Sequence, residues 1–286
     1  MKSKIIISML LLLCSVSSYC RPATIDYWRS DSVKVMRLLH KASRLPRETN
    51  LMLYFARQLC GLPYVAHTLD IHKEEQLVVN LRKMDCTTYV ENVLALKMCM
   101  DSGHHTFEEF CKCLRLVRYR DGIVAYANRQ HYFTYWIEQN VKKGLVSDIH
   151  EPVPPFSAIQ TVRVNYMTLH AGKYSMLVQH PEWKPLIRKM EDSISGCRYR
   201  YIPKGMLGNQ TLLRGTIHDG DIIVILTSKS GLDTSHIGIA VWHSDGLHLL
   251  NASAIRHRIV EEPKLFSVYM AEHPSFIGIR VCRALK

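Results

Sequence analysis

Residues 84–94 read MDCTTYVENVL, and this stretch decides how the rest of the chain is interpreted. Apolar residues recur at helical spacing from Tyr89 to Met98, which predicts a helix with one face in the core. Asp85 is a typical N-cap, so Cys86 falls in the first turn of this helix. The positive end of a helix dipole favours thiolate, and we therefore expect a lowered pKa for Cys86.

Three roles are open to a thiol in this place: a buried packing group, half of a disulfide, or a nucleophile. Two of the nine cysteines, Cys14 and Cys20, precede Arg21. The cysteines that follow are Cys60, Cys86, Cys99, Cys111, Cys113, Cys197 and Cys282. Their number is odd, so at least one thiol has no partner within the chain. A nucleophile also needs a base within reach and a third group that orients the base.

The chain begins with a segment that has the layout of a secretory signal. MKSKIIISMLLLLCSVSSYC carries two lysines, an apolar run too short to span a bilayer, and small polar residues before Arg21. We therefore expect residues 1–20 to be a signal peptide and the protein to be exported to the periplasm or cell envelope. A lipid anchor on Cys14 or Cys20 is disfavoured because bulky Leu13 and Tyr19 precede them. The mature sequence contains no other apolar run of transmembrane length.

The composition is that of a basic globular protein. The formal net charge is +12, which favours anionic partners such as anionic lipid or an acidic wall polymer. Lysine and arginine are scattered, without a basic tract or a nucleic-acid-binding signature, so we expect no nucleic-acid partner. We expect a monomer.

The base is predicted in residues 233–254, DTSHIGIAVWHSDGLHLLNASA. HIGIAV alternates as a strand, with His236 on the more open face, and HSDG is a turn signal before a returning strand. A loop of two or four residues places Asn251 on the face of His236, whereas a three-residue loop would place His248 there instead. We predict Cys86 as nucleophile, His236 as base and Asn251 as the orienting group, because Cys-His-Asn is a known arrangement for thiol acyl transfer.

The order of elements predicts an α+β fold. Helical patterns occur in residues 31–60, 105–117 and 131–143, with Thr106 as a cap, whereas residues 159–169 alternate like a strand and residues 217–286 are rich in strands. Helices first and an antiparallel sheet later are typical of an α+β domain. No linker or repeat interrupts residues 21–286, so we expect a single domain.

Several motifs carry a family resemblance. LCGLPYVAHTLD, DCTTYV, SHIGIAV and LLNAS resemble, in this order, the NlpC-type branch of papain-like cell-wall hydrolases. More narrowly, LVVNLRKMDCTTYVENVLAL, RYRDG, RQHYF, YIPK and GLDTSHIGI resemble an N-acetylmuramoyl-L-alanine amidase family common in Bacteroides-like bacteria. The motifs extend over residues 60–255.

The resemblance implies a papain-like (NlpC-type) fold, with the nucleophile at a helix start packed on an antiparallel sheet. It assigns Cys86, His236 and Asn251 to the triad, and places Tyr64, Asp85 and Ser235 along the substrate site. Each of these residues also has a purely structural interpretation: Tyr64 as a buried ring, Asp85 as a helix cap and Ser235 as a strand end. The large separation of Cys86 and His236 predicts an insertion over roughly residues 104–215.

The implied activity is hydrolysis of the bond between N-acetylmuramic acid and L-alanine in peptidoglycan or muropeptides, without a cofactor. A cysteine endopeptidase acting within the stem peptide is an alternative, and a non-catalytic wall-binding protein is a further one. A zinc amidase is disfavoured because the fifteen histidines include no H-E-x-x-H motif. Substrate carboxylates could be held by basic side chains after residue 117, namely Arg118, Arg120, Arg129 and His131.

Overall fold

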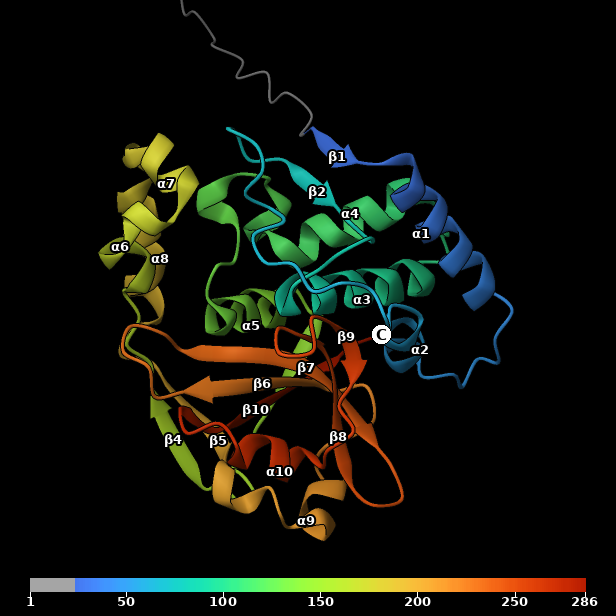
Figure 1. Ribbon diagram of the computed structural model, residues 1–286, viewed down its shortest axis with the longest axis vertical. Helices are drawn as coiled ribbons and strands as arrows, with labels where there is room; N and C mark the ends of the chain where they lie inside the picture. The colour runs from blue at the N-terminus through green and yellow to red at the C-terminus, as the bar shows by residue number, and fades with distance from the viewer. Residues whose placement is uncertain (1–23) are drawn as a thin grey trace, which may run out of the picture.

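The computed structural model describes residues 24–286, so the predicted signal peptide and the candidate anchors Cys14 and Cys20 lie outside the described residues. Five helices form a layer on one side of the molecule (Figure 1). These helices are α1 (Arg29–Ala42), α2 (Leu51–Gln58), α3 (Cys86–Asp101), α4 (Phe107–Arg118) and α5 (Phe133–Lys142). The helical pattern over 31–60 thus becomes two helices, separated by a turn that contains Pro46, a residue unsuited to a helix interior.

A sheet lies beneath the helices, and its strands follow the spatial order β4-β5-β10-β6-β7-β8-β9, with β3 also paired to β10. All of these pairings are antiparallel. The strands are β3 (Val146–Ile149), β4 (Ala158–Thr161), β5 (Arg198–Pro203), β6 (Ile222–Thr227), β7 (Thr234–Trp242), β8 (Leu247–Ser253), β9 (Arg258–Glu261) and β10 (Phe276–Ala284). A separate parallel pair joins β1 (Ile25–Tyr27) to β2 (Leu77–Val79). The predicted α+β architecture, a helical N-terminal part against an antiparallel sheet, is confirmed.

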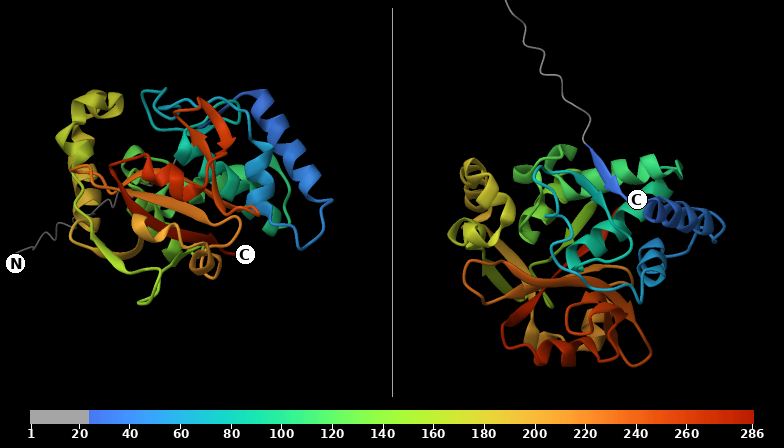
Figure 2. Two further views of the ribbon diagram at one scale, coloured as in Figure 1. Left: turned by 60° about the horizontal axis from the view of Figure 1, so that its bottom comes forward. Right: turned by 45° about the horizontal axis from the view of Figure 1, so that its top comes forward.

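The remaining helices, of which only α8 exceeds six residues, lie around the sheet and at one side of the helical layer (Figure 2). They are α6 (Tyr166–Leu169), α7 (Ser175–Gln179), α8 (Lys184–Ile194), α9 (Gln210–Arg214) and α10 (Phe266–Ala271). One-turn 3-10 helices occur at Arg120–Gly122, Tyr126–Asn128, Ala171–Lys173, Pro181–Trp183 and Lys204–Met206. The strand predicted over 159–169 is only partly right, because β4 ends at Thr161 and Val162 and Val164 instead pack into the core around α6 and α8.

Both faces of the sheet are covered. Alternate residues of β7 divide between two cores: Ile237 and Ile239 face α3, whereas Ala240 faces the α10 side. Helix α3 is buried almost all round rather than on the single face that was predicted, because α2, α4 and the sheet enclose it. Even Glu91 is buried in α3, where the Arg118 guanidinium compensates its charge at 2.6 Å.

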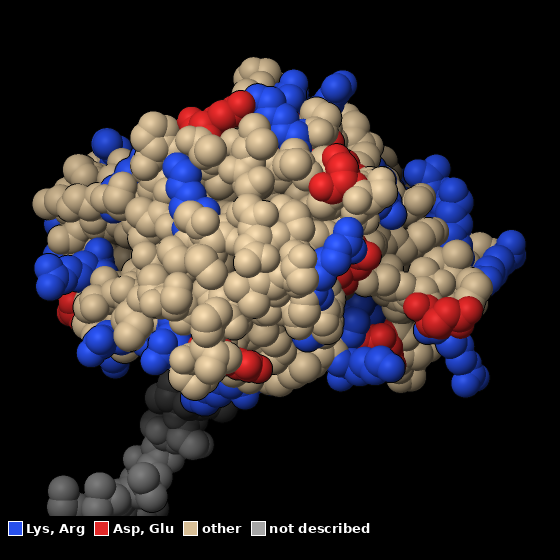
Figure 3. Space-filling view, turned by 90° about the horizontal axis from the view of Figure 1, so that it is seen from below, with Lys and Arg blue, Asp and Glu red and all other residues tan. Residues whose placement is uncertain are grey.

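The surface charge is dispersed on the face shown in Figure 3, where lysine and arginine side chains are scattered among neutral and acidic residues. No helix within residues 24–286 is long and apolar enough to cross a bilayer.

Candidate active site

Cys86 begins helix α3, as predicted. The Asp85 carboxylate accepts hydrogen bonds from the backbone N–H of Thr88 at 2.8 Å and from its hydroxyl at 2.7 Å. In return the Thr88 hydroxyl oxygen accepts from the backbone N–H of Asp85 at 3.0 Å, which completes a capping box. This reciprocal cap fixes the direction in which the chain enters α3, and it therefore fixes the position of the thiol.

Cys86 as a residue is partly exposed, but its thiol is buried against the backbone of Ile237 in β7. Burial raises the pKa of Cys86 to about 12, and the Asp85 carboxylate adds to the rise, against hydrogen bonds from the backbone N–H of Ile237 and from Thr87. The lowered pKa expected from the helix dipole is therefore wrong. A helix dipole contributes only ~1 kcal/mol at a helix end, and the burial of the thiol outweighs it. Cys86 is a neutral thiol at pH 7, so a base must take its proton.

His236 is aimed by a β-bulge. Ile225 pairs with His236 and Leu226 pairs with Thr234, so Ser235 is the extra residue between two paired positions. A bulge bends its strand and redirects the neighbouring side chain. Ser235 therefore acts through the backbone: as the extra residue of the bulge, it helps to set the direction of the His236 side chain.

The imidazole of His236 is oriented by Asn251. Its Nε2 lies 2.9 Å from Asn251 Oδ1, and because an amide oxygen only accepts, Nε2 carries the proton and Nδ1 is left with a lone pair. Burial lowers the pKa of His236, and the hydrogen bond that His236 donates to Asn251 opposes this only in part. A neutral imidazole with a free Nδ1 is the form that can act as a base at pH 7.

The hairpin parity predicted from the sequence is confirmed. Trp242 pairs with Leu247 across a four-residue loop, and this register puts the fully buried Asn251 on the face of His236. His248 points away and is bonded to Glu262 O at 2.9 Å and to an oxygen of Asp245 at 3.1 Å. The alternative in which His248 orients the base is therefore not the arrangement observed.

The absence of a side chain at Gly238 leaves room for Asn251 on the neighbouring strand. A Cβ built on Gly238 would lie 2.9 Å from Leu250 O, closer than real Cβ atoms come to backbone, and would press on Asn251 Cβ at 3.0 Å. Only glycine fits here without moving Asn251 away from His236.

Tyrosines flank Cys86 from two elements. Burial raises the pKa of Tyr64 to about 12, and the nearby charges of Cys86 and Asp85 contribute, so Tyr64 lies beside the thiol as the resemblance implied. Tyr269 of α10 is raised to a pKa of about 12 by burial, with smaller contributions from Glu262 and Cys86. His273, just after α10, is close enough to help lower the pKa of His236. Tyr269 and His273 could not be predicted from the sequence, because no motif marks the segment that contains them.

Arg129 and His131 line a cavity of about 240 Å³ that also borders Asp85 and Thr87. Arg129 is already paired: its guanidinium contacts Asp70 and lies 3.6 Å from Glu75. Burial and the neighbouring Arg129 lower the pKa of His131 to about 3, so His131 is neutral at pH 7. Both residues thus line a cavity that reaches the two neighbours of Cys86, but the charge of Arg129 is already paired and His131 carries none.

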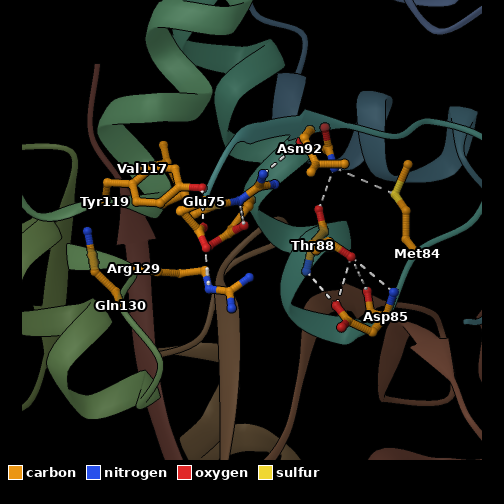
Figure 4. Close-up of polar contacts among 12 residues, drawn as sticks. Glu75, Met84, Asp85, Thr88, Asn92, Val117, Tyr119, Arg129 and Gln130 are labelled. Atoms are coloured by element: carbon orange, nitrogen blue, oxygen red, sulfur yellow. Dashed lines mark hydrogen bonds and ion pairs between the residues drawn. The ribbon is translucent and has the colours of Figure 1, made fainter. Parts of the chain in front are cut away.

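The other two basic candidates lie elsewhere. Arg118 is buried behind α3, where it donates to Glu91 and to Val78 O at 2.7 Å. Arg120 is exposed and donates to Asn128 at 2.6 Å. Figure 4 shows how the charged groups under α3 connect: the Tyr119 hydroxyl donates to Glu75 at 2.7 Å, and Glu75 in turn meets Arg129.

Among residues 24–286 no group of three or more His, Cys, Asp or Glu side chains is arranged to hold a metal ion. The thiol of Cys86 meets the backbone of Ile237, the neighbour of His236, and the His236 imidazole is bonded to the Asn251 amide.

Comparison with known proteins places the chain in a family. Residues 54–279 match the N-acetylmuramoyl-L-alanine amidase-like family. An N-acetylmuramoyl-L-alanine amidase from Bacteroides uniformis superposes with a TM-score of 0.77 at 34% identity, covering 82% of this chain and 98% of that one. A Bacteroides fragilis protein described as a candidate xylanase superposes with a TM-score of 0.74 at 36% identity, covering 80% and 99%.

A more distant protein, LPG0564 from Legionella pneumophila, shares the fold, with a TM-score of 0.67 at 21% identity over 90% of this chain and 95% of its own. No protein with a curated description is significantly similar to the chain. The fold and the family match define an amidase-like class of bacterial cell-wall hydrolase. The chain belongs to the N-acetylmuramoyl-L-alanine amidase-like family.

Proposed function

We propose that the protein is a cysteine amidase that hydrolyses the bond between N-acetylmuramic acid and L-alanine in peptidoglycan or its fragments. The observation that carries the proposal is the 2.9 Å contact of His236 Nε2 with Asn251, which leaves Nδ1 free to act as the base. The thiol at the capped start of α3 contacts the backbone of Ile237, the residue next to His236. A papain-like arrangement of this kind, Cys86, His236 and Asn251, is suited to acyl transfer from an amide.

In the first step, His236 Nδ1 takes the proton of the Cys86 thiol as the sulfur attacks the lactyl carbonyl carbon. The carbonyl oxygen becomes an oxyanion, which the backbone N–H of Cys86 can bind, because the structure gives that N–H no acceptor within residues 24–286. The C–N bond then breaks, and His236 returns the proton to the leaving amine of L-alanine. The product on the enzyme is a thioester.

In the second step, water attacks the thioester carbonyl. His236 Nδ1 takes a proton from the water, the C–S bond breaks, and the proton returns to Cys86. The depressed pKa of His236 keeps the imidazole neutral at the start of both steps, which general-base catalysis requires.

The proposal also covers the substrate site, the oligomeric state and the location of the protein. Tyr64, Asp85 and the cavity that contains Arg129 and His131 form the substrate site, and the substrate is peptidoglycan or a muropeptide. The protein acts as a monomer, without a cofactor, in the periplasm or cell envelope. The leader pattern of residues 1–20 supports export, and residues 104–215 supply walls around the site as an insertion.

The endopeptidase alternative uses the same triad, so only the products distinguish the two activities. A digest of a defined muropeptide, analysed by mass spectrometry, should contain free N-acetylmuramic acid and a peptide that begins with L-alanine. Cleavage after the D-glutamyl residue, with the sugar still attached to L-alanine, would contradict the amidase. A chelator should leave the rate unchanged, and strong inhibition would point to a metal enzyme instead.

A further inference from the structure

Helix α1 lies at the outer edge of the helical layer, and one of its faces is exposed (Figure 1). Its buried side chains recur at helical spacing and face the core: Asp31, Val35, Leu38, Leu39 and Ala42. The side chains exposed on the opposite face are those of Arg29, Val33, Met36, Arg37 and His40. Residues three or four positions apart are neighbours on a helix, so these five side chains form one continuous surface.

The charge on this surface and on the turn that follows it is positive. The exposed cations are Arg29, Arg37, Lys41, Arg44 and Arg47. None of these five forms an ion pair within residues 24–286, whereas arginines elsewhere are paired, such as Arg57 with Glu261 at 3.2 Å and Arg283 with Asp221 at 2.7 Å. The positive charge of α1 is therefore available to an anionic partner.

The carboxylates around α1 do not neutralise it. Asp31 is buried and lies 3.1 Å from the Arg82 guanidinium, and Asp26 lies 3.2 Å from His72. Of the acidic side chains within residues 24–50, only Glu48 has no basic side chain beside it. On the neighbouring helix α4, the two carboxylates of the first turn both face Lys112, at 3.2 and 3.6 Å.

Apolar side chains lie among these cations. Trp28 is 63% exposed, Val33 is 56% exposed and Met36 is 40% exposed. The Arg82 guanidinium lies 3.7 Å from the centre of the Trp28 ring, which holds the indole at the start of α1. Tyr27 of β1 is 45% exposed beside it. Tryptophan and tyrosine are enriched where a membrane meets water, because their rings are apolar and carry a polar group.

The combination of charge and apolar surface distinguishes between two anionic partners. A soluble acidic polymer would bind the cations and leave Trp28, Val33 and Met36 in water. An anionic bilayer instead binds cations through its lipid headgroups and receives shallow apolar side chains at the boundary of its acyl chains. Only the bilayer uses both features of α1.

We propose that the exposed surface of α1, together with Trp28 and the turn as far as Arg47, binds an anionic phospholipid membrane. This surface would hold the protein on the membrane without a helix that crosses it. The proposal does not depend on the amidase function, because none of these residues belongs to the triad or lines the cavity that contains Arg129 and His131.

Co-sedimentation with phospholipid vesicles tests the proposal on the mature chain, residues 21–286. Vesicles of phosphatidylcholine with about 30% phosphatidylglycerol should bind the protein at least tenfold more strongly than pure phosphatidylcholine. Added salt should weaken this binding, because it screens exposed charges. Absence of binding to the anionic vesicles, equal binding to both kinds, or binding that salt does not weaken would overturn the proposal.

The charged contribution is measured with a double variant, Arg37→Gln with Arg44→Gln. Each cation near an anionic bilayer strengthens binding about fivefold, so this variant should bind about 25-fold more weakly. Arg163→Gln with Arg198→Gln is the matched control, because it removes the same charge from exposed arginines beside β4 and in β5. An equal loss in both double variants would mean that net charge alone acts, and would overturn the assignment to α1.

The apolar contribution separates a membrane from a soluble polyanion. Val33→Gln with Met36→Gln should weaken vesicle binding about tenfold and leave binding to soluble polyglutamate unchanged. Urea unfolding should give wild-type midpoints for this variant, because both side chains are exposed. Unchanged vesicle binding would refute the membrane and assign the surface to a soluble acidic polymer instead.

Discussion

Asn251→Ala should slow the enzyme because it removes the group that orients His236. Asn251 is fully buried, and its Oδ1 lies 2.9 Å from Nε2 of the imidazole. Losing one such bond costs about 0.5–1.5 kcal/mol, and an N–H left without an acceptor adds about 1–3 kcal/mol. If roughly 1.5–3 kcal/mol of this reaches the transition state, kcat/KM falls about 10- to 100-fold.

His248→Ala is the matched control, because His248 is also a buried polar residue of β8 but points to the opposite face, toward Glu262 and Asp245. It should change kcat/KM less than threefold. The assay is the initial rate of L-alanyl peptide release from a muropeptide, with circular dichroism and urea unfolding to verify that both variants fold. A large loss in His248→Ala with a small one in Asn251→Ala would refute the assigned geometry of the hairpin.

Further predictions concern the same site. Gly238→Ala should lower kcat/KM more than tenfold and destabilise the fold by about 1–3 kcal/mol, because the added Cβ would meet Asn251. Gly208→Ala is the control and should have neither effect, because no atom lies within 4 Å of its added Cβ. Equal activities of the two variants would contradict this prediction. The rate at which iodoacetamide alkylates Cys86, measured by peptide mapping, should rise about tenfold per pH unit from pH 7 to 10, because the pKa of the thiol is raised to about 12. A constant rate between pH 6 and 8 would instead indicate a preformed thiolate. The pKa of His131 is lowered to about 3, so its neutral form stabilises the fold above pH 6.5 and this stabilisation is lost as pH falls toward 3. His131→Gln should therefore lose about 1–3 kcal/mol less stability than wild type between pH 7 and 4.5 in urea titrations, and an identical loss would exclude this origin.

Local patterns allowed the start of α3 and the hairpin to be predicted. A cap residue followed by a helical period fixes where Cys86 lies, and strict alternation with an even loop fixes which face Asn251 shares. Both depend only on neighbours in sequence, and both were found in the structure.

The features that could not be predicted depend on packing between distant segments. The raised pKa of Cys86 arises because the sheet and its surroundings bury the thiol, which outweighs the helix dipole that the sequence made visible. Tyr269 reaches the site only because α10 folds back against β8 and β10, and Tyr174 enters the cavity only through the segment around α7. A buried charge such as Glu91 looks like a surface residue until Arg118 is placed beside it.

The central claim is that Cys86 forms a thioester with the muramoyl group. Acid quenching of a reaction with N-acetylmuramoyl-L-alanyl-D-glutamate, followed by proteolysis and mass spectrometry, measures what the Cys86 peptide carries. It should gain one N-acetylmuramoyl group and no amino acid, and the adduct should be absent in Cys86→Ala, which should be inactive but folded. An adduct that includes L-alanine, or full turnover by Cys86→Ala, would contradict the account.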